Sequence, residues 1–338
     1  MKKSFFVAGC LLLVTGSSAQ TVSQKLHKAF QQFQGDAQLK HAISSLYVID
    51  AKTGKVVFDK NSQVGLAPAS TQKIITSVTA FELLGKDYRY KTELRYTGTI
   101  NNDTLKGDFS LRCSGDPTLG SWRYKNTDDS ILLHRWTDAV KKSGIKSIAG
   151  DIIYNYKDFS SNSIPDGWIW QDLGNYYGAG ADILNWQENQ YDILLRSGNE
   201  IGGKVEILGA NPHFINELKT SAKGSGDNAY VYFPKGITPS LISGTIPVGE
   251  SAFKISASDP DALQNFLLLF GHFLNLQGVK GKDLGIPTRY YIDEQSKIYS
   301  SSIPISTHYS PTLDSIIYWF NKKSINLYGE ALIKTFSY

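Results

Sequence analysis

Apolar residues recur at helical spacing after Pro68 and predict a helix that begins near Ser70 and ends at Gly85. Side chains three or four residues apart share one face of a helix. Proline favours a helix start and glycine favours a helix end, which sets the two limits. The apolar positions of this helix are Ile74, Ile75, Val78, Phe81 and Leu84.

Three further segments have helical patterns. Residues 21–42 are polar and helical in pattern, and residues 259–276 follow a helical pattern with Pro260 in the first turn. Near the end of the chain, residues 313–320 have one apolar face and residues 327–334 continue as another helix. The face of the first of these is formed by Leu313, Ile316, Ile317 and Phe320.

Alternating polar and apolar residues predict strands elsewhere. Residues 45–50 and 55–59 predict a hairpin, in which Lys52-Thr53-Gly54 supplies the tight turn. From about residue 90 the chain changes to short strands separated by Gly, Asn, Asp and Ser, which predicts a β-rich region. The expected strands are 90–96, 105–113, 148–154, 191–195, 203–208 and 229–233.

Composition adds limits rather than a function. The 338 residues are enough for two or three domains, and 41% hydrophobic with 20% charged residues is ordinary for a globular protein. The net charge of +4 falls to +2 without Lys2 and Lys3, which does not favour a nucleic-acid partner. The six histidines have no metal-ligand spacing, and there is no glycine-rich phosphate loop, so we expect neither a metal nor a cofactor.

Residues 1–19 have the pattern of a cleaved signal peptide, with two lysines, a short apolar run and small residues before Gln20. The apolar run is too short for a stable membrane span, so we expect export to a bacterial periplasm. Lipidation at Cys10 is the competing interpretation of the same segment. Cleavage would leave Cys113 alone, where a small buried hydrophobe in a strand is favoured over a catalytic thiol.

Ser70 and Lys73 are the first candidate catalytic pair. Their spacing of three residues lets the hydroxyl and the amine meet in the first turn of the predicted helix. Serine becomes a good nucleophile when a base removes its proton, and lysine is such a base when burial or a nearby cation lowers its pKa. Taken alone, the pair is a weak signal, and a helix-capping serine with a solvated lysine is the favoured interpretation.

Ser324 and Asn326 form a second motif, S-x-N, at the predicted junction of two helices. A hydroxyl and an amide at such a junction can point into a cleft. S-x-x-K together with S-x-N is two thirds of the motif set of the penicillin-recognising serine enzymes. In that set the third motif follows S-x-N, which is a further reason to interpret Lys52-Thr53-Gly54 as a turn.

Beyond these motifs, the chain after residue 19 resembles the DacB-like D-alanyl-D-alanine carboxypeptidase/endopeptidases, the low-molecular-mass class C penicillin-binding proteins. The interval of 254 residues between Ser70 and Ser324 also fits that family better than the shorter interval of β-lactamases. The similar segments are 114–119 (S-G-D-P-T-L), 150–152 (G-D-I), 166–179 (with W-Q-D-L-G-N-Y-Y-G-A), 185–186, 224–230 and 244–247.

The resemblance implies an α+β fold, the penicillin-binding-protein/β-lactamase-like serine transpeptidase fold with a large β-rich insertion. It implies that Ser70 attacks the D-Ala-D-Ala peptide bond of peptidoglycan stem peptides and that Lys73 is its general base. Ser324 would carry a proton to the leaving amine, and Asn326 would bind substrate and hold Lys73. β-Lactam antibiotics would acylate the same serine.

The chain ends at Tyr338, twelve residues after Asn326, so we expect a catalytic domain that is incomplete at its C-terminus and lacks the family's third motif. Two other functions therefore stay open. One is a serine β-lactamase or esterase on the same scaffold, and the other is a catalytically inert wall-binding protein.

Some side chains near the motifs keep two interpretations. Glu330 either supports the site or lies on a solvated helix face. The aromatic residues of the 166–179 segment are favoured as core residues, with a glycan-stacking surface as the alternative. They are Trp168, Trp170, Tyr176 and Tyr177.

The expected domain order is a catalytic part at 20–90, a β-rich insertion at 91–285 and a second catalytic part at 286–338. Because few contacts cross a domain border, limited proteolysis should cut first near residues 90 and 285. Mass spectrometry of the fragments would locate the cuts. Cleavage spread evenly through the β-rich region would contradict an independent module.

Overall fold

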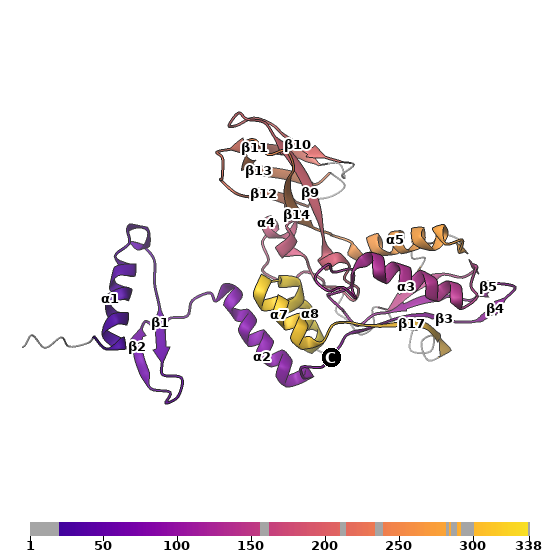
Figure 1. Cartoon of the computed structure of the whole chain (residues 1–338), viewed down its shortest axis with the longest axis horizontal. Coiled ribbons are helices and arrows are strands. Elements are labelled where there is room, and N and C mark those ends of the chain that lie inside the picture. The colour runs from indigo at the N-terminus through magenta and orange to yellow at the C-terminus, as the bar shows by residue number, and fades with distance from the viewer. Residues whose placement is uncertain are drawn as a thin grey trace, which may run out of the picture. The chain divides into compact units, whose positions relative to one another are not determined.

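The computed structural model describes residues 20–155, 162–209, 214–233, 239–281, 284, 289–291 and 301–336 (Figure 1). The predicted signal peptide, including Cys10, lies outside these residues. The described chain divides between Ala69 and Ser70 into two compact units, which are described separately. None of the described helices combines the length and the apolar character that crossing a bilayer requires.

The first unit is a helix packed on a hairpin. Helix α1 (Val22–Gln34) is capped by Thr21, and strands β1 (Leu46–Ile49) and β2 (Val56–Lys60) pair antiparallel. The Phe30 and Phe58 rings join the two, with ring centroids 5.5 Å apart. The predicted hairpin is confirmed, whereas the predicted helix at 21–42 ends early, at Gln34, and only the short turn η1 (Ala37–Leu39) follows it.

The turn of this hairpin explains the K-T-G triplet. The Asp50 carboxylate accepts hydrogen bonds from the backbone N–H of Lys52 and of Thr53, at 3.1 and 2.7 Å. Gly54 adopts a φ of 69°, which glycine reaches without steric penalty. The triplet therefore forms the turn between β1 and β2, as its position in the hairpin predicts.

The second unit contains four sheets, with strand orders β16-β8-β6-β3-β17, β15-β7-β5-β4, β10-β9-β14 and β11-β13-β12 among the described residues. Its helices α2, α7 and α8 lie together, and α3 and α5 lie side by side (Figure 1). The described helices of this unit are α2 (Gln72–Leu84), α3 (Asp129–Lys142), α4 (Trp170–Leu173), α5 (Ala262–Leu276), α7 (Leu313–Lys323) and α8 (Asn326–Phe336), and its described 3-10 turns are η2 (Ala69–Thr71), η3 (Tyr176–Gly178) and η4 (Gln187–Asn189). Its strands are β3 (Lys91–Tyr96), β4 (Thr99–Asn101), β5 (Thr104–Lys106), β6 (Phe109–Arg112), β7 (Ser147–Ile148), β8 (Ile152–Asn155), β9 (Gln190–Ser197), β10 (Val205–Leu208), β11 (Ile215–Ser221), β12 (Asn228–Tyr232), β13 (Leu241–Pro247), β14 (Phe253–Ser258), β15 (Lys280–Gly281), β16 (Arg289–Tyr291) and β17 (Ile303–Tyr309).

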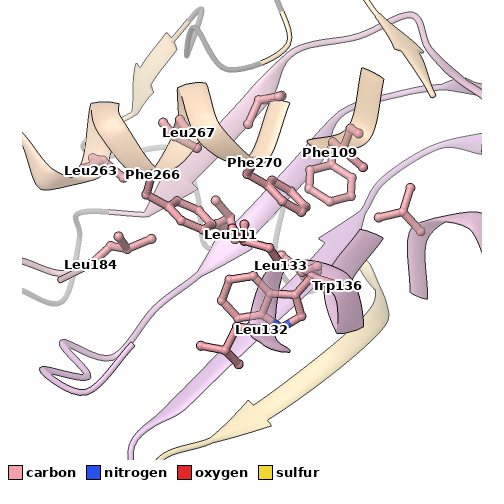
Figure 2. Packing of buried hydrophobic residues seen from close by; sticks show 14 of the residues in the cluster. Phe109, Leu111, Leu132, Leu133, Trp136, Leu184, Leu263, Phe266, Leu267 and Phe270 are labelled. Carbon is pink, nitrogen blue, oxygen red and sulfur yellow. The ribbon is translucent and has the colours of Figure 1, made fainter. Parts of the chain in front are cut away.

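The largest core lies between α3, α5 and the strands β3 and β6 (Figure 2). Trp136 of α3 is fully buried and meets the Phe266 and Phe270 rings of α5 edge-on, with centroids 5.7 and 6.2 Å apart. Helix α3 was not predicted, although Leu132, Trp136 and Val140 recur at helical spacing. The helical pattern of α3 was present in the sequence, but the segment lies within a region that the strand patterns predicted to be β-rich.

Two predicted strands are wrong in detail, because glycines interrupt them. The predicted strand 105–113 is two strands, β5 and β6, and the predicted strand 148–154 is β7 and β8. A side chain at Gly107 would collide with the Thr97 carbonyl, and one at Gly150 would collide with the Gly107 carbonyl. Glycine lets these backbones approach closely where the chain leaves one sheet for another.

A smaller core joins the two three-stranded sheets of residues 190–258. In one sheet β9 lies between β10 and β14, and in the other β13 lies between β11 and β12. Alternate residues of β9, among them Ile193 and Leu195, are buried between the sheets. The predicted insertion borders at 90 and 285 stay a prediction.

A third core joins α2 to α7 and α8. The predicted apolar face of α7 is buried, as its spacing indicates. The predicted apolar face of α2 is instead largely exposed, since Ile75 is 67% exposed and Ser77 and Ala80 are the buried residues. Small side chains at these two positions let α7 and α8 approach the α2 backbone.

Cys113 lies just after β6 and is half-buried, and burial raises the pKa of its thiol.

Two buried titratable side chains have opposite pKa shifts. Burial raises the pKa of Asp116 to about 6, against the effect of hydrogen bonds from Thr118. Burial lowers the pKa of His308 to about 4, and the nearby Arg135 acts in the same direction. Among the described residues, Asp116 Oδ2 and His308 Nε2 are buried without a hydrogen-bond partner.

These shifts predict opposite pH dependences of stability. An unfolded aspartate has a pKa of about 3.9 and an unfolded histidine about 6.5. As pH falls, folded Asp116 takes up its proton before the unfolded chain does, which raises the free energy of unfolding between about pH 6 and pH 4. For His308 the unfolded chain takes up the proton first, so the free energy of unfolding falls between about pH 6.5 and pH 4.

We expect chemical denaturation of Asp116→Asn and His308→Gln to separate the two effects. From pH 7.5 to pH 4.5, the stability of the unmodified protein should rise relative to Asp116→Asn and fall relative to His308→Gln. Each change should be on the order of 2 kcal/mol. Parallel pH profiles for all three proteins would contradict the assigned burial of both groups.

Candidate active site

Ser70 lies in η2 (Ala69–Thr71), the 3-10 turn that leads into α2. Its side chain is exposed, whereas Lys73 in the first turn of α2 is half-buried. Lys73 Nζ lies 3.1 Å from Ser70 Oγ. The spacing of three residues thus brings the hydroxyl and the amine within proton-transfer distance.

Ser324 and Asn326 come from the α7–α8 junction. Ser324 ends α7 in the left-handed conformation, with φ 56° and ψ 43°, and Asn326 is the first residue of α8. Ser324 Oγ donates a hydrogen bond of 2.8 Å to Ser70 Oγ. Asn326 Oδ1 accepts a hydrogen bond of 2.6 Å from Lys73 Nζ. The structure therefore brings all four predicted site residues together.

The surroundings of Lys73 favour its neutral form. Burial lowers the pKa of Lys73, and the Glu330 carboxylate opposes this shift. The Phe320 ring, whose centre is 5.8 Å from Lys73 Nζ, favours the charged form and so acts with Glu330 against the effect of burial. Burial raises the pKa of Glu330, so this side chain is not the freely solvated group of the alternative interpretation. A lowered lysine pKa is the change that a general base requires.

Two connections around the site were not predicted. Asn326 Nδ2 donates a 2.7 Å hydrogen bond to the Tyr177 carbonyl, which fixes the orientation of the amide. Ser77 Oγ donates to the Lys73 carbonyl at 2.7 Å and accepts from Asn321 Nδ2 at 2.9 Å, linking α2 to α7. A backbone carbonyl carries no side-chain signal in a sequence, so the Tyr177 connection could not have been found there.

The aromatic segment before the site is partly exposed. Trp170 and Tyr176 are each 54% exposed, so their interpretation as core residues is wrong. Trp168 and Tyr177 are half-buried. The Trp170 ring packs against Tyr232, with centroids 5.0 Å apart, and its Nε1 donates to the Phe233 carbonyl. Trp170 thus has one aromatic neighbour and one hydrogen bond, while more than half of its surface stays exposed.

The sequence profile of the D-Ala-D-Ala carboxypeptidase 3 (S13) family matches residues 24–337. The chain belongs to this family. It is 25% identical over 313 residues to a D-alanyl-D-alanine carboxypeptidase of Actinomadura sp. (strain R39), covering 89% of this chain and 55% of that protein. It is 31% identical over 153 residues to the D-alanyl-D-alanine carboxypeptidase DacB of Haemophilus influenzae, covering 45% of this chain and 30% of that protein.

Solved structures of family members have the same fold. Penicillin binding protein 4 (dacB) from Haemophilus influenzae matches with a TM-score of 0.62 at 22% identity, over 83% of this chain and 59% of that one. The same protein in complex with a novel β-lactam matches with a TM-score of 0.56 at 20% identity, over 85% of this chain and 59% of that one. The α+β penicillin-binding-protein-like fold is therefore confirmed. The S13 chain spans about half the length of the Actinomadura relative.

The left-handed conformation of Ser324 predicts a specific order of stabilities. A residue with a Cβ in this region is destabilised by about 1–2 kcal/mol, and glycine is not. In chemical denaturation, the free energy of unfolding of Ser324→Gly should therefore be larger than that of Ser324→Ala by about 1 kcal/mol. Both variants lose the hydroxyl that contacts Ser70, so the difference isolates the backbone.

Ser143 provides the matched control, since it ends α3 in the right-handed conformation with φ −72°. There the order should reverse, with Ser143→Ala at least as stable as Ser143→Gly. Equal stabilities of the two Ser324 variants would show that the α7–α8 turn is not strained.

Proposed function

We propose that this chain is a serine D-Ala-D-Ala carboxypeptidase and endopeptidase that cleaves peptidoglycan stem peptides through an acyl-serine intermediate. The observation that carries the proposal is the hydrogen-bonded set of Ser70, Lys73, Ser324 and Asn326. Membership of the S13 family supports the substrate class. The β-lactam complex of the Haemophilus relative supports acylation by the same class of inhibitor.

The first step is attack by Ser70. Neutral Lys73 Nζ takes the hydroxyl proton across the 3.1 Å separation while Ser70 Oγ bonds to the carbonyl carbon of the penultimate D-Ala. Asn326 Oδ1 accepts a hydrogen bond from the ammonium group that this forms, as the 2.6 Å distance allows. The Ser70 backbone N–H would serve as one donor to the developing oxyanion.

The second step breaks the peptide bond. Ser324 Oγ lies 2.8 Å from Ser70 Oγ, where it can receive a proton from Lys73 and pass one to the leaving amine. D-Ala then leaves with its amine, and the rest of the peptide stays on Ser70 as an ester. Water attacks the ester carbonyl as it gives a proton to Lys73, and Lys73 returns that proton to Ser70 Oγ when the ester bond breaks. The free hydroxyl and the neutral amine are thereby restored.

Export to the periplasm fits this substrate. The predicted signal peptide at 1–19 would carry the chain to the compartment that contains peptidoglycan. The exposed Trp170 and Tyr176 keep glycan stacking as a second contact with the wall.

Labelling with fluorescent penicillin tests the proposal. We expect a covalent adduct on Ser70, located by peptide mapping, and at least a hundredfold slower labelling of Lys73→Ala, because that change removes the base. Ser70→Ala should not be labelled. Lys86→Ala, which alters an exposed lysine just after α2, is the matched control and should label normally.

Each alternative function predicts a different result. Rapid loss of the Ser70 adduct with release of hydrolysed penicillin would indicate a β-lactamase. An inert wall-binding protein would bind peptidoglycan without labelling. Equal labelling of Ser70→Ala and the unmodified chain would place the nucleophile elsewhere and overturn the proposed role of Ser70.

A further inference from the structure

Glu188 is a buried carboxylate that the proposed reaction does not use. Its side chain is 1% exposed. It lies in η4 with Gln187 and Asn189, and all three residues have positive φ values, of 52°, 55° and 49°. Each such residue with a Cβ costs about 1–2 kcal/mol, so the chain accepts considerable strain to place this carboxylate inside the protein.

The Glu188 carboxylate receives hydrogen bonds from several elements. Ser121 Oγ, Arg123 Nε and Tyr328 OH donate to Oε1, at 2.8, 2.7 and 2.9 Å. Arg123 Nη2 and Gln190 Nε2 donate to Oε2, at 3.1 and 3.3 Å. The Arg123–Glu188 pair need not stabilise the fold, because the cost of desolvating two charges offsets their attraction. Its two hydrogen bonds nevertheless hold the guanidinium and the carboxylate in one geometry.

This cluster is attached to the two helices that carry Ser324 and Asn326. Tyr328 is in the first turn of α8, two residues after Asn326, and is fully buried. Burial and the Glu188 carboxylate both raise the pKa of Tyr328, which keeps its hydroxyl a donor. On the α7 side, the Arg123 guanidinium stacks 5.6 Å from the Trp319 ring.

We propose that Glu188 is a positioning residue that acts through Tyr328. Its carboxylate sets where α8 begins, and so sets the hydrogen bond between Asn326 Oδ1 and Lys73 Nζ. The catalytic consequence rests on the proposed function, whereas the geometric consequence for Lys73 does not.

Tyr328→Phe is the sharpest test, since it removes one hydroxyl and keeps the ring. Tyr90→Phe is the matched control. Tyr90 is also fully buried, and its hydroxyl is 2.9 Å from Thr335 Oγ1 in the last turn of the same helix. A purely structural role predicts the same effects for both variants, whereas positioning predicts that only Tyr328→Phe alters Lys73.

The first readout is the pH titration of Lys73, monitored by NMR in protein labelled with ¹³C at the lysine ε-carbons. The Lys73 signal is assigned by its absence from the spectrum of Lys73→Arg. In Tyr328→Phe the midpoint should fall by roughly 0.5–1 pH unit, because the charged amine loses part of its hydrogen bond to Asn326. In Tyr90→Phe it should stay unchanged. Thermal unfolding should change similarly in both variants.

The second readout is the rate of Ser70 acylation by penicillin. It should fall about tenfold in Tyr328→Phe, because the ammonium group that forms on Lys73 loses part of its hydrogen bond to Asn326, and less than about twofold in Tyr90→Phe. Glu188→Gln gives a rescue comparison, since its amide oxygen can still accept from Tyr328. It should lose stability with Arg123 unpaired, yet shift the Lys73 titration less than Tyr328→Phe does.

The two proposals can fail separately. Absence of acylation in the unmodified chain would overturn the proposed function, and the Lys73 titration would still decide the role of Glu188. An unchanged Lys73 midpoint in Tyr328→Phe, or an equal shift in Tyr90→Phe, would overturn positioning by Glu188.

Discussion

The site depends on one lysine amine held between two parts of the chain that are 253 residues apart. Lys73 Nζ reaches Ser70 Oγ within α2 and its leading turn, and reaches Asn326 Oδ1 at the start of α8. The first contact is local and follows from helical spacing. The second exists only if α2 packs against α7 and α8 in one position and one register, so the geometry of the site depends on the third core.

Small residues make that close packing possible. Ser77 and Ala80 are the buried side of α2, while larger apolar residues of the same helix face outward. On α8, a side chain at Gly329 would come within 3.0 Å of the Phe320 ring, which itself lies near Lys73. Bulkier residues at these positions would push the helices apart, and the Lys73 amine would lose its partner on α8.

Several residues near the site lower the stability of the fold by the conformation or the burial that their positions require. Ser324 holds a left-handed backbone conformation, Lys73 is partly buried, and Glu188 is a buried charge in a strained turn. Strain of this kind persists where the surrounding packing over-determines the local structure. The cores of this unit supply that support, since large buried side chains join α3, α5 and the neighbouring strands.

The sequence by itself determined the local elements and the residues of the candidate site. Periodicity located α2, α5, α7 and α8, and the spacing of Ser70 to Lys73 indicated their contact, because helix geometry is a property of neighbouring residues. It misjudged which side of α2 is buried, because burial depends on partners distant in sequence. It missed α3 although the helical pattern was present, because strand signals surround that segment. The Tyr177 carbonyl and the donors around Glu188 were decided by tertiary structure alone. Backbone carbonyls and long-range hydrogen bonds leave no periodic signal, and only the packed chain brings them to Asn326 and α8.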